Sequence, residues 1–137
     1  VANGVRAFTP QMLNAAAANA NYRGCIVNTA SLAGLLTGPA MGIYSVSKHA
    51  VVALSECLYH DLSIATSQVT TAVLCPPYVS TNMDQSHRNT FYIFPDAEPL
   101  PVVEARMANI LRQANPDFPY DQVPSMKDRR DALLAAL

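Results

Sequence analysis

The sequence predicts an α/β fold, a partial doubly wound architecture in which helices flank a parallel sheet. Two short stretches, residues 25–30 and 69–75, are rich in apolar and β-branched residues, which is typical of strands buried on both faces. Two longer stretches, residues 3–20 and 43–65, repeat apolar residues at helical spacing. Because helices and strands alternate along the chain, we expect the strands to run parallel.

Each element follows from a local signal. Alanines support the first helix, which contains Pro10 and is therefore expected to bend. Glycines and a proline make residues 31–41 a loop. Pro76 and Pro77 end the second strand. The second helix is expected to bury one apolar stripe, made of Ile43, Val46, Ala50, Leu54, Cys57, Leu58, Leu62 and Ala65.

The end of the chain adds shorter elements. Residues 76–90 form a polar loop, and a strand at 91–94 and helices at 102–114 and 126–137 follow. Three strands alone would leave an edge strand with unpaired backbone groups. We therefore expect residues 1–137 to be a single partial domain whose other strands lie elsewhere.

Composition excludes several classes of function. Of 137 residues, 14% are charged and the net charge is −1, so we expect no nucleic-acid partner and no membrane partner. No apolar run could span a bilayer, and no secretory signal is visible. The three cysteines form no C-x-x-C pair and are expected to be reduced core residues of a cytoplasmic protein. No metal site is expected, because His49 and His60 are too far apart along their helix.

Three polar residues form a candidate proton-transfer site. Tyr44 and Lys48 are four positions apart and therefore share one face of the predicted helix. Ser31 follows the first predicted strand and can reach the same place from the sheet. A free tyrosine titrates near pH 10, so a neighbouring ammonium is needed to favour its phenolate form. Tyr-x-x-x-Lys alone is a weak signal, but its combination with the preceding strand, serine and glycine-containing loop is much stronger.

At these residues the chain resembles the short-chain dehydrogenase/reductase family. The resemblance covers residues 1–83 and includes the helix GVRAFTPQM, the strand G-x-I-V-N-x-A-S, the Tyr-x-x-x-Lys pair and the turn P-x-x-V-x-T. The later segment FYIFPDAEPLPVVEARMANIL is similar to the C-terminal strand and helix of one bacterial branch. The resemblance implies a Rossmann-like fold of which this chain is the C-terminal half, with the N-terminal half absent.

The resemblance also implies a reaction, the interconversion of a secondary alcohol and a ketone with NAD or NADP. Tyr44 would be the general acid or base, Ser31 would hold the reacting oxygen, and Lys48 would activate Tyr44 and bind the nicotinamide ribose. Hydride would move between substrate and cofactor. The expected cofactor-binding residues are Tyr44, Lys48, Pro76, Pro77, Val79 and Thr81.

The chain departs from the family pattern in ways that affect binding. It contains no G-x-x-x-G-x-G or G-x-G-x-x-G turn, so the pyrophosphate of a dinucleotide lacks its usual helix N-terminus and binding by this chain alone should be weak. Pro77 replaces the usual glycine of the turn. Only about ten residues separate Thr81 from Phe91, where the family inserts a substrate lid.

Two other functions compete with an oxidoreductase. A serine hydrolase using Ser31, His60 and Asp61 is disfavoured because the sequence around Ser31 lacks the glycines of a nucleophile elbow. A catalytically inactive remnant that acts as an oligomerisation or interaction module remains open. In the family, the helices matching residues 3–20 and 43–65 pair across subunits, so the resemblance implies a homodimer or homotetramer.

Overall fold

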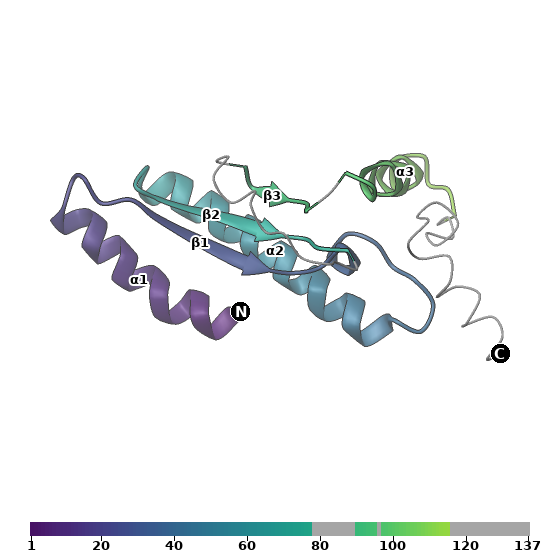
Figure 1. The fold of residues 1–137 in the computed structure, drawn as a ribbon, viewed down its shortest axis with the longest axis horizontal. Coiled ribbons are helices and arrows are strands. Elements are labelled where there is room, and N and C mark those ends of the chain that lie inside the picture. Colours follow the sequence, from purple (N-terminus) through teal and green to yellow (C-terminus); the bar gives the residue numbers. More distant parts are fainter. Residues whose placement is uncertain (78–89, 96, 116–137) are drawn as a thin grey trace.

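A three-stranded parallel sheet lies at the centre of the computed structural model, which describes residues 1–77, 90–95 and 97–115 (Figure 1). The strands lie in the order β1 (Gly24–Thr29), β2 (Val69–Leu74) and β3 (Tyr92–Ile93). β1 and β2 pair in parallel over their full length, whereas β3 pairs in parallel only with Val73 and Leu74. The predicted α/β fold with a parallel sheet is therefore confirmed.

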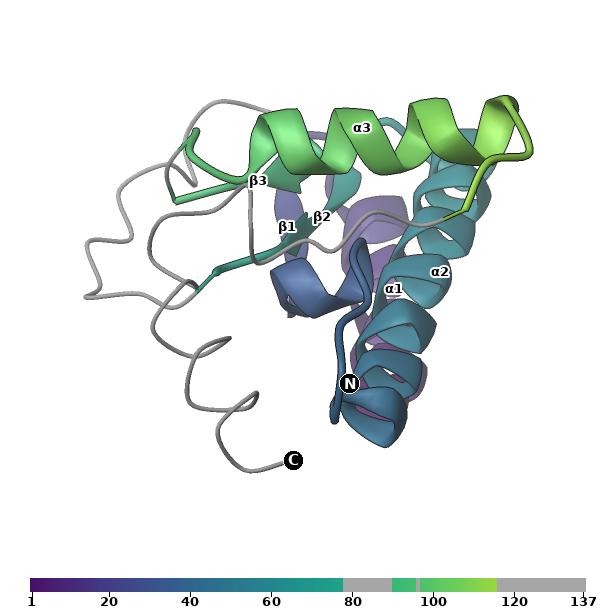
Figure 2. The same ribbon diagram turned by 90° about the vertical axis from the view of Figure 1, so that its right-hand side faces the viewer.

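Two long helices lie on the same face of this sheet, α1 (Ala2–Ala18) and α2 (Gly42–Ala65) (Figures 1 and 2). A buried cluster joins them to β2 and consists of Ala16, Leu58, Leu62 and Val69. Ile26 of β1 packs against the same cluster. Both helices match their predicted positions to within two residues, and Pro10 lies inside α1 as expected.

Two further elements pack at the carboxyl ends of the strands. A short 3-10 helix, η1 (Leu32–Gly34), directly follows β1 within the segment that was predicted to be an irregular loop. The helix α3 (Leu100–Leu111) begins two residues earlier than predicted, with Pro101 in its first turn, where its missing N–H costs nothing. Leu32, Leu36 and Val102 form the buried contact between η1 and α3.

The other face of the sheet carries little cover within the described residues. Its buried cluster consists only of Ala72, Leu74 and Ile93, while Cys25 and Val27 of β1 are exposed. Within the described ranges β1 pairs only with β2, so its second edge is unpaired, as the strand count predicted. A groove of about 460 Å³ runs between α1 and this edge.

The predicted apolar stripe of α2 is only partly right. Leu58 and Leu62 are buried and Leu54 is half-buried, but the other members, Ile43, Val46, Ala50, Cys57 and Ala65, are exposed. Ile43 and Val46 are 87% and 67% exposed, whereas the face that meets the sheet contains Ser45, Val52, Ser55, Leu58 and Leu62. The helix turns its small serines inward because β1 and η1 approach its backbone closely. Periodicity alone selected the more apolar face and could not detect that approach.

The expectation for the cysteines is also only partly right. All three thiols are free, but only Cys75 is buried, whereas Cys25 and Cys57 are exposed. Cys25 lies on the uncovered face of β1, and Cys57 lies on the outer face of α2. The predicted loop at 76–90 and helix at 126–137 lie largely or wholly outside the described residues.

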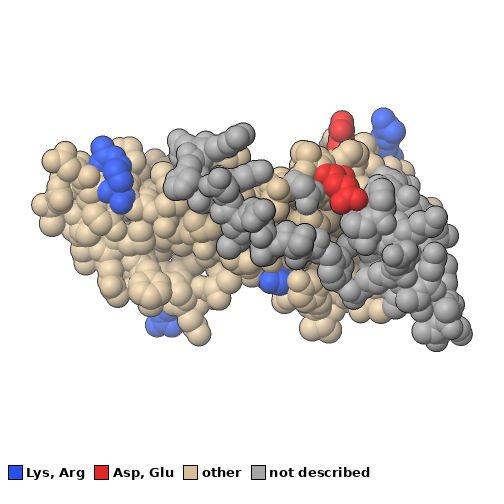
Figure 3. Space-filling model, viewed as in Figure 1, with Lys and Arg blue, Asp and Glu red and all other residues tan. Residues whose placement is uncertain are grey.

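The surface of the described part carries few charges. Figure 3 shows lysine and arginine side chains that stand apart from one another on this face, with no basic patch. None of the helices in the described ranges is both long and apolar enough to cross a bilayer. No group of three or more potential metal-ligating side chains occurs among the same residues.

Candidate active site

Ser31 lies where the first two strands end. Because β1 and β2 are parallel, the residues that follow them, Ser31 and Pro76, meet at one edge of the sheet. The Ser31 hydroxyl donates a hydrogen bond to the Pro76 carbonyl (3.3 Å) and accepts one from the Ala33 amide (3.2 Å). The Leu32 amide also donates to Pro76 (2.9 Å). Two chain segments therefore fix this serine at the carboxyl end of the sheet.

Tyr44 and Lys48 lie in the first two turns of α2. The Lys48 ammonium is 5.6 Å from the centroid of the Tyr44 ring, so the predicted side-by-side arrangement is present. Tyr44 is 46% exposed, whereas Lys48 is half-buried. The phenol can therefore meet a molecule from solvent while the amine supports it from one turn further along the helix.

Gly34 brings the serine turn onto the helix that carries Tyr44 and Lys48. A Cβ atom at Gly34 would lie 2.7 Å from the Lys48 carbonyl oxygen and 2.8 Å from a Val52 methyl group. No residue other than glycine fits this contact without displacing backbone. Ser31, three residues before Gly34, is thus held in a turn that rests directly on Lys48.

Cys75 directly precedes Pro76 next to this site and is the buried, free cysteine that its apolar neighbourhood predicted. Burial raises the pKa of its thiol from the ordinary 9.0 to about 11, a hydrogen bond from the Ser31 backbone acts in the opposite direction, and the Glu56 charge adds a smaller increase. The thiol is therefore an inert core group and not a nucleophile.

The remaining candidate residues fall into two groups. Pro76 and Pro77 follow β2 at the serine edge and are half-buried, while Val79 and Thr81 lie outside the described residues. His49 does not contact His60: its Nδ1 is 2.9 Å from the Ser45 carbonyl and its Nε2 is 3.4 Å from Arg106 of α3.

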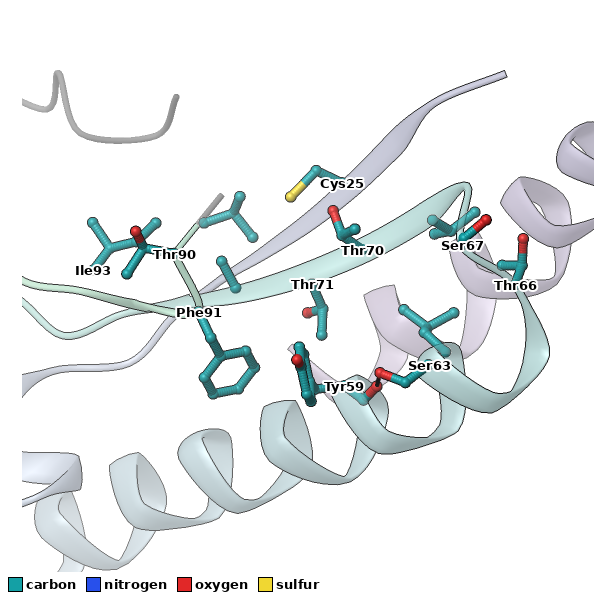
Figure 4. Close-up of a pocket in the computed structure, with 14 residues that line it drawn as sticks. Cys25, Tyr59, Ser63, Thr66, Ser67, Thr70, Thr71, Thr90, Phe91 and Ile93 are labelled. Atoms are coloured by element: carbon teal, nitrogen blue, oxygen red, sulfur yellow. Dashed lines mark hydrogen bonds between the residues drawn. The ribbon is translucent and has the colours of Figure 1, made fainter. Parts of the chain in front are cut away.

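A hollow lies elsewhere, near the start of β2. It measures about 380 Å³, and threonine and serine hydroxyls and the rings of Tyr59 and Phe91 line it (Figure 4). None of Ser31, Tyr44 and Lys48 contributes to it. The hollow is thus separate from the three candidate residues.

Comparison with known proteins identifies the family. The sequence model described as "short chain dehydrogenase" matches residues 1–91, about two thirds of the chain. The chain belongs to the short-chain dehydrogenase family. Curated relatives include a "CLA biosynthesis dehydrogenase/reductase" of Lactiplantibacillus plantarum, 38% identical over 72 residues, which are 51% of this chain and 25% of that protein. Another is "Granaticin polyketide synthase putative ketoacyl reductase 1" of Streptomyces violaceoruber, 36% identical over 61% of this chain and 30% of that protein.

Solved structures of family members share the fold. A short-chain dehydrogenase/reductase from Burkholderia phymatum, in complex with NAD, superimposes with a TM-score of 0.70 at 34% identity. The match covers 85% of this chain and 56% of that chain. A putative short-chain dehydrogenase from Novosphingobium aromaticivorans also gives a TM-score of 0.70, at 27% identity, over 98% of this chain and 55% of that chain. The chain thus spans little more than half of these family members and a smaller share of the curated ones.

Proposed function

We propose that this chain supplies the catalytic half of an NAD(P)-dependent oxidoreductase that interconverts a secondary alcohol and a ketone. The observation that carries the proposal is the position of Lys48 beside the Tyr44 ring, with the Ser31 turn resting on the Lys48 backbone through Gly34. A phenol beside an ammonium, with a hydroxyl in the turn that contacts the same helix, could protonate a carbonyl oxygen and stabilise the charge that develops there.

In the direction of reduction, Tyr44 gives its hydroxyl proton to the carbonyl oxygen while the carbonyl carbon accepts a hydride. Ser31 donates a hydrogen bond to the same oxygen in place of its long bond to the Pro76 carbonyl (3.3 Å). Lys48 stabilises the resulting phenolate by its positive charge. Oxidation of the alcohol follows the same path in reverse, with Tyr44 as the general base.

The nicotinamide cofactor supplies or accepts the hydride when it is bound. The residues present fit such a group, because the Lys48 ammonium forms no ion pair with a carboxylate in the described ranges and can bond ribose hydroxyls. Pro76, Pro77, Val79 and Thr81 are the other candidate contacts, of which the first two follow β2 at the serine edge. The Burkholderia relative in complex with NAD supports this assignment.

The test is turnover by the complete polypeptide that carries this chain, measured as loss of NADH or NADPH absorbance with a panel of ketones. Tyr44→Phe removes the transferable proton and should lower kcat by ~10²–10⁴-fold. Tyr59→Phe makes the same change on the same helix outside the site and should leave kcat unchanged. Full activity in Tyr44→Phe would rule out the proposed role of this residue.

A second proposed property is self-association through α1 and α2, which would also be the function of an inactive remnant. Ile43 (87% exposed) and Ile64 (89%) of α2 belong to an exposed series with heptad spacing. The series consists of Ile43, Val46, Ala50, Ala53, Cys57, His60 and Ile64. Phe8 of α1 adds a ring that is 60% exposed. An exposed apolar series of this kind is suited to helix pairing between the subunits of a homodimer or homotetramer.

Light scattering tests the association. Val46→Glu should convert the oligomer into monomers, whereas Ser63→Glu, an exposed control on the same helix outside this series, should not. A monomeric unmodified protein would contradict the proposal.

The three free thiols also support a reducing compartment, and we propose a cytoplasmic location on that ground.

A further inference from the structure

A buried hydrogen bond joins β1 to α2 away from the proposed reacting groups. The Asn28 side-chain amide donates to the Ser55 hydroxyl (3.0 Å), and Ser55 donates to the Val51 carbonyl one turn earlier (2.7 Å). Asn28 is 6% exposed and Ser55 is fully buried. Side chain to side chain bonds between elements are uncommon in protein cores, and both partners here are more polar than their neighbours.

Both partners of this hydrogen bond lie close in the sequence to the candidate catalytic residues. Asn28 precedes Ser31 by three residues along the same chain segment, and Ser55 follows Lys48 by seven residues, which is two helical turns. The bond therefore connects the strand that delivers the serine with the helix that carries the tyrosine and lysine. It fixes how far β1 can slide along α2.

Gly34 supplies a second fixed point between the same two segments. Its Cα lies so close to the Lys48 carbonyl that an added Cβ would be 2.7 Å from that oxygen. One contact would allow the Ser31 turn to pivot on the helix. Two contacts, one on each side of Ser31 along the chain, restrict how this segment can move on the helix.

We propose that Asn28 and Ser55 are positioning residues for the Ser31, Tyr44 and Lys48 site, acting together with the glycine contact. The proposal rests on the proposed function, since it assigns these residues to the alignment of that site. A displacement of about 1 Å from a productive geometry lowers turnover by about a hundredfold, so a remote pair of this kind can control kcat.

The decisive comparison uses a single and a double variant of the complete polypeptide. Ser55→Ala leaves the Asn28 amide buried without its partner and should lower both the melting temperature and kcat. In Asn28→Leu/Ser55→Ala, apolar groups of similar shape replace both partners, so the melting temperature should recover. If the pair positions the site, kcat of the double variant stays at least about tenfold below that of the unmodified protein, a difference of about 1.4 kcal/mol, while the KM for the cofactor is unchanged.

Thr71→Val is the matched control. Thr71 is 5% exposed, and its hydroxyl donates to the Ile26 carbonyl (2.9 Å), so the variant also removes one buried hydrogen bond, but one that does not involve α2. It should lower the melting temperature without lowering kcat. A double variant with full kcat, or an equal loss of kcat in Thr71→Val, would overturn the positioning role.

A second measurement does not depend on turnover. The Gly34 α-protons lie against a Val52 methyl group, so a nuclear Overhauser contact between them reports how the serine turn rests on α2. We expect this contact to weaken in the double variant and to persist in Thr71→Val. If the unmodified polypeptide transfers no hydride, the proposed function fails, and this contact still decides whether the pair aligns the segment. An unchanged contact in the double variant would refute the alignment.

Discussion

The buried Cys75 thiol should make the free energy of unfolding decrease at alkaline pH. It is fully buried among Ala30, Leu35, Val52 and Val73. Burial in this apolar cluster raises its pKa from 9.0 to about 11, because a thiolate there would lose its hydration. The folded protein therefore holds the thiol proton more tightly than the unfolded chain does.

The sign and size of the effect follow from this difference. The contribution of the protonated thiol is complete below pH 9.0 and is lost as the pH rises towards about 11. With these two values, the free energy of unfolding should fall by about 1 kcal/mol at pH 10 relative to pH 8 from this group alone. Above pH 11 the total loss approaches about 3 kcal/mol.

The perturbation is Cys75→Ala, studied by urea unfolding at several pH values alongside the unmodified protein. The variant has a pH-independent cost of about 1 kcal/mol or more, because it leaves a small cavity. Burial raises the pKa of Tyr92 and holds that phenol protonated throughout this range, although the Cys75 charge also raises the same pKa. The difference between the unfolding free energies of the two proteins therefore isolates the thiol, and it should shrink by about 1 kcal/mol between pH 8 and pH 10. A difference that stays constant over this range would refute the raised pKa.

Three further predictions concern single side chains. Ser45→Ala should raise the melting temperature, because the Ser45 hydroxyl is buried without a hydrogen-bond partner among the described residues and alanine favours helix. Tyr92→Phe should lower the unfolding free energy by about 1 kcal/mol, since Tyr92 donates a hydrogen bond to Glu56 of α2. Pro10→Ala should stabilise α1 by up to about 3 kcal/mol, because Pro10 leaves an acceptor inside the helix without its usual donor.

Thermal or urea unfolding checks all three. Tyr59→Phe is the control for Tyr92, because both rings pack on Phe91 at centroid distances of 5.1 and 4.8 Å, but only Tyr92 donates to Glu56. Equal losses in the two variants would show that the hydrogen bond adds nothing. A destabilised Ser45→Ala would mean that the hydroxyl has a partner, and a destabilised Pro10→Ala would mean that Pro10 improves the packing of α1.

The sheet and the helices could be predicted from the sequence. Buried parallel strands require apolar runs such as those of β1 and β2, and the long helices repeat apolar residues at helical spacing. The sequence also located Ser31 at a strand end and placed Tyr44 beside Lys48, because those positions depend on strand ends and helical spacing. The inward face of α2 could not be predicted in this way. Ser55 faces inward because Asn28 needs a partner there, and a contact between residues 27 positions apart leaves no local pattern.

The two faces of α2 explain why apolar periodicity failed on this helix. Where the inner face of a helix holds a small side chain such as Ser55, the helix can approach a strand and a glycine turn closely, which is what the Ser55 and Gly34 contacts require. Its larger apolar side chains, such as Ile43 and Ile64, are then left on the outer face. The same helix thus carries the proposed catalytic groups and an exposed apolar series through which we propose self-association. A substitution such as Ser55→Leu should therefore disturb the site, whereas Val46→Glu should disturb only assembly.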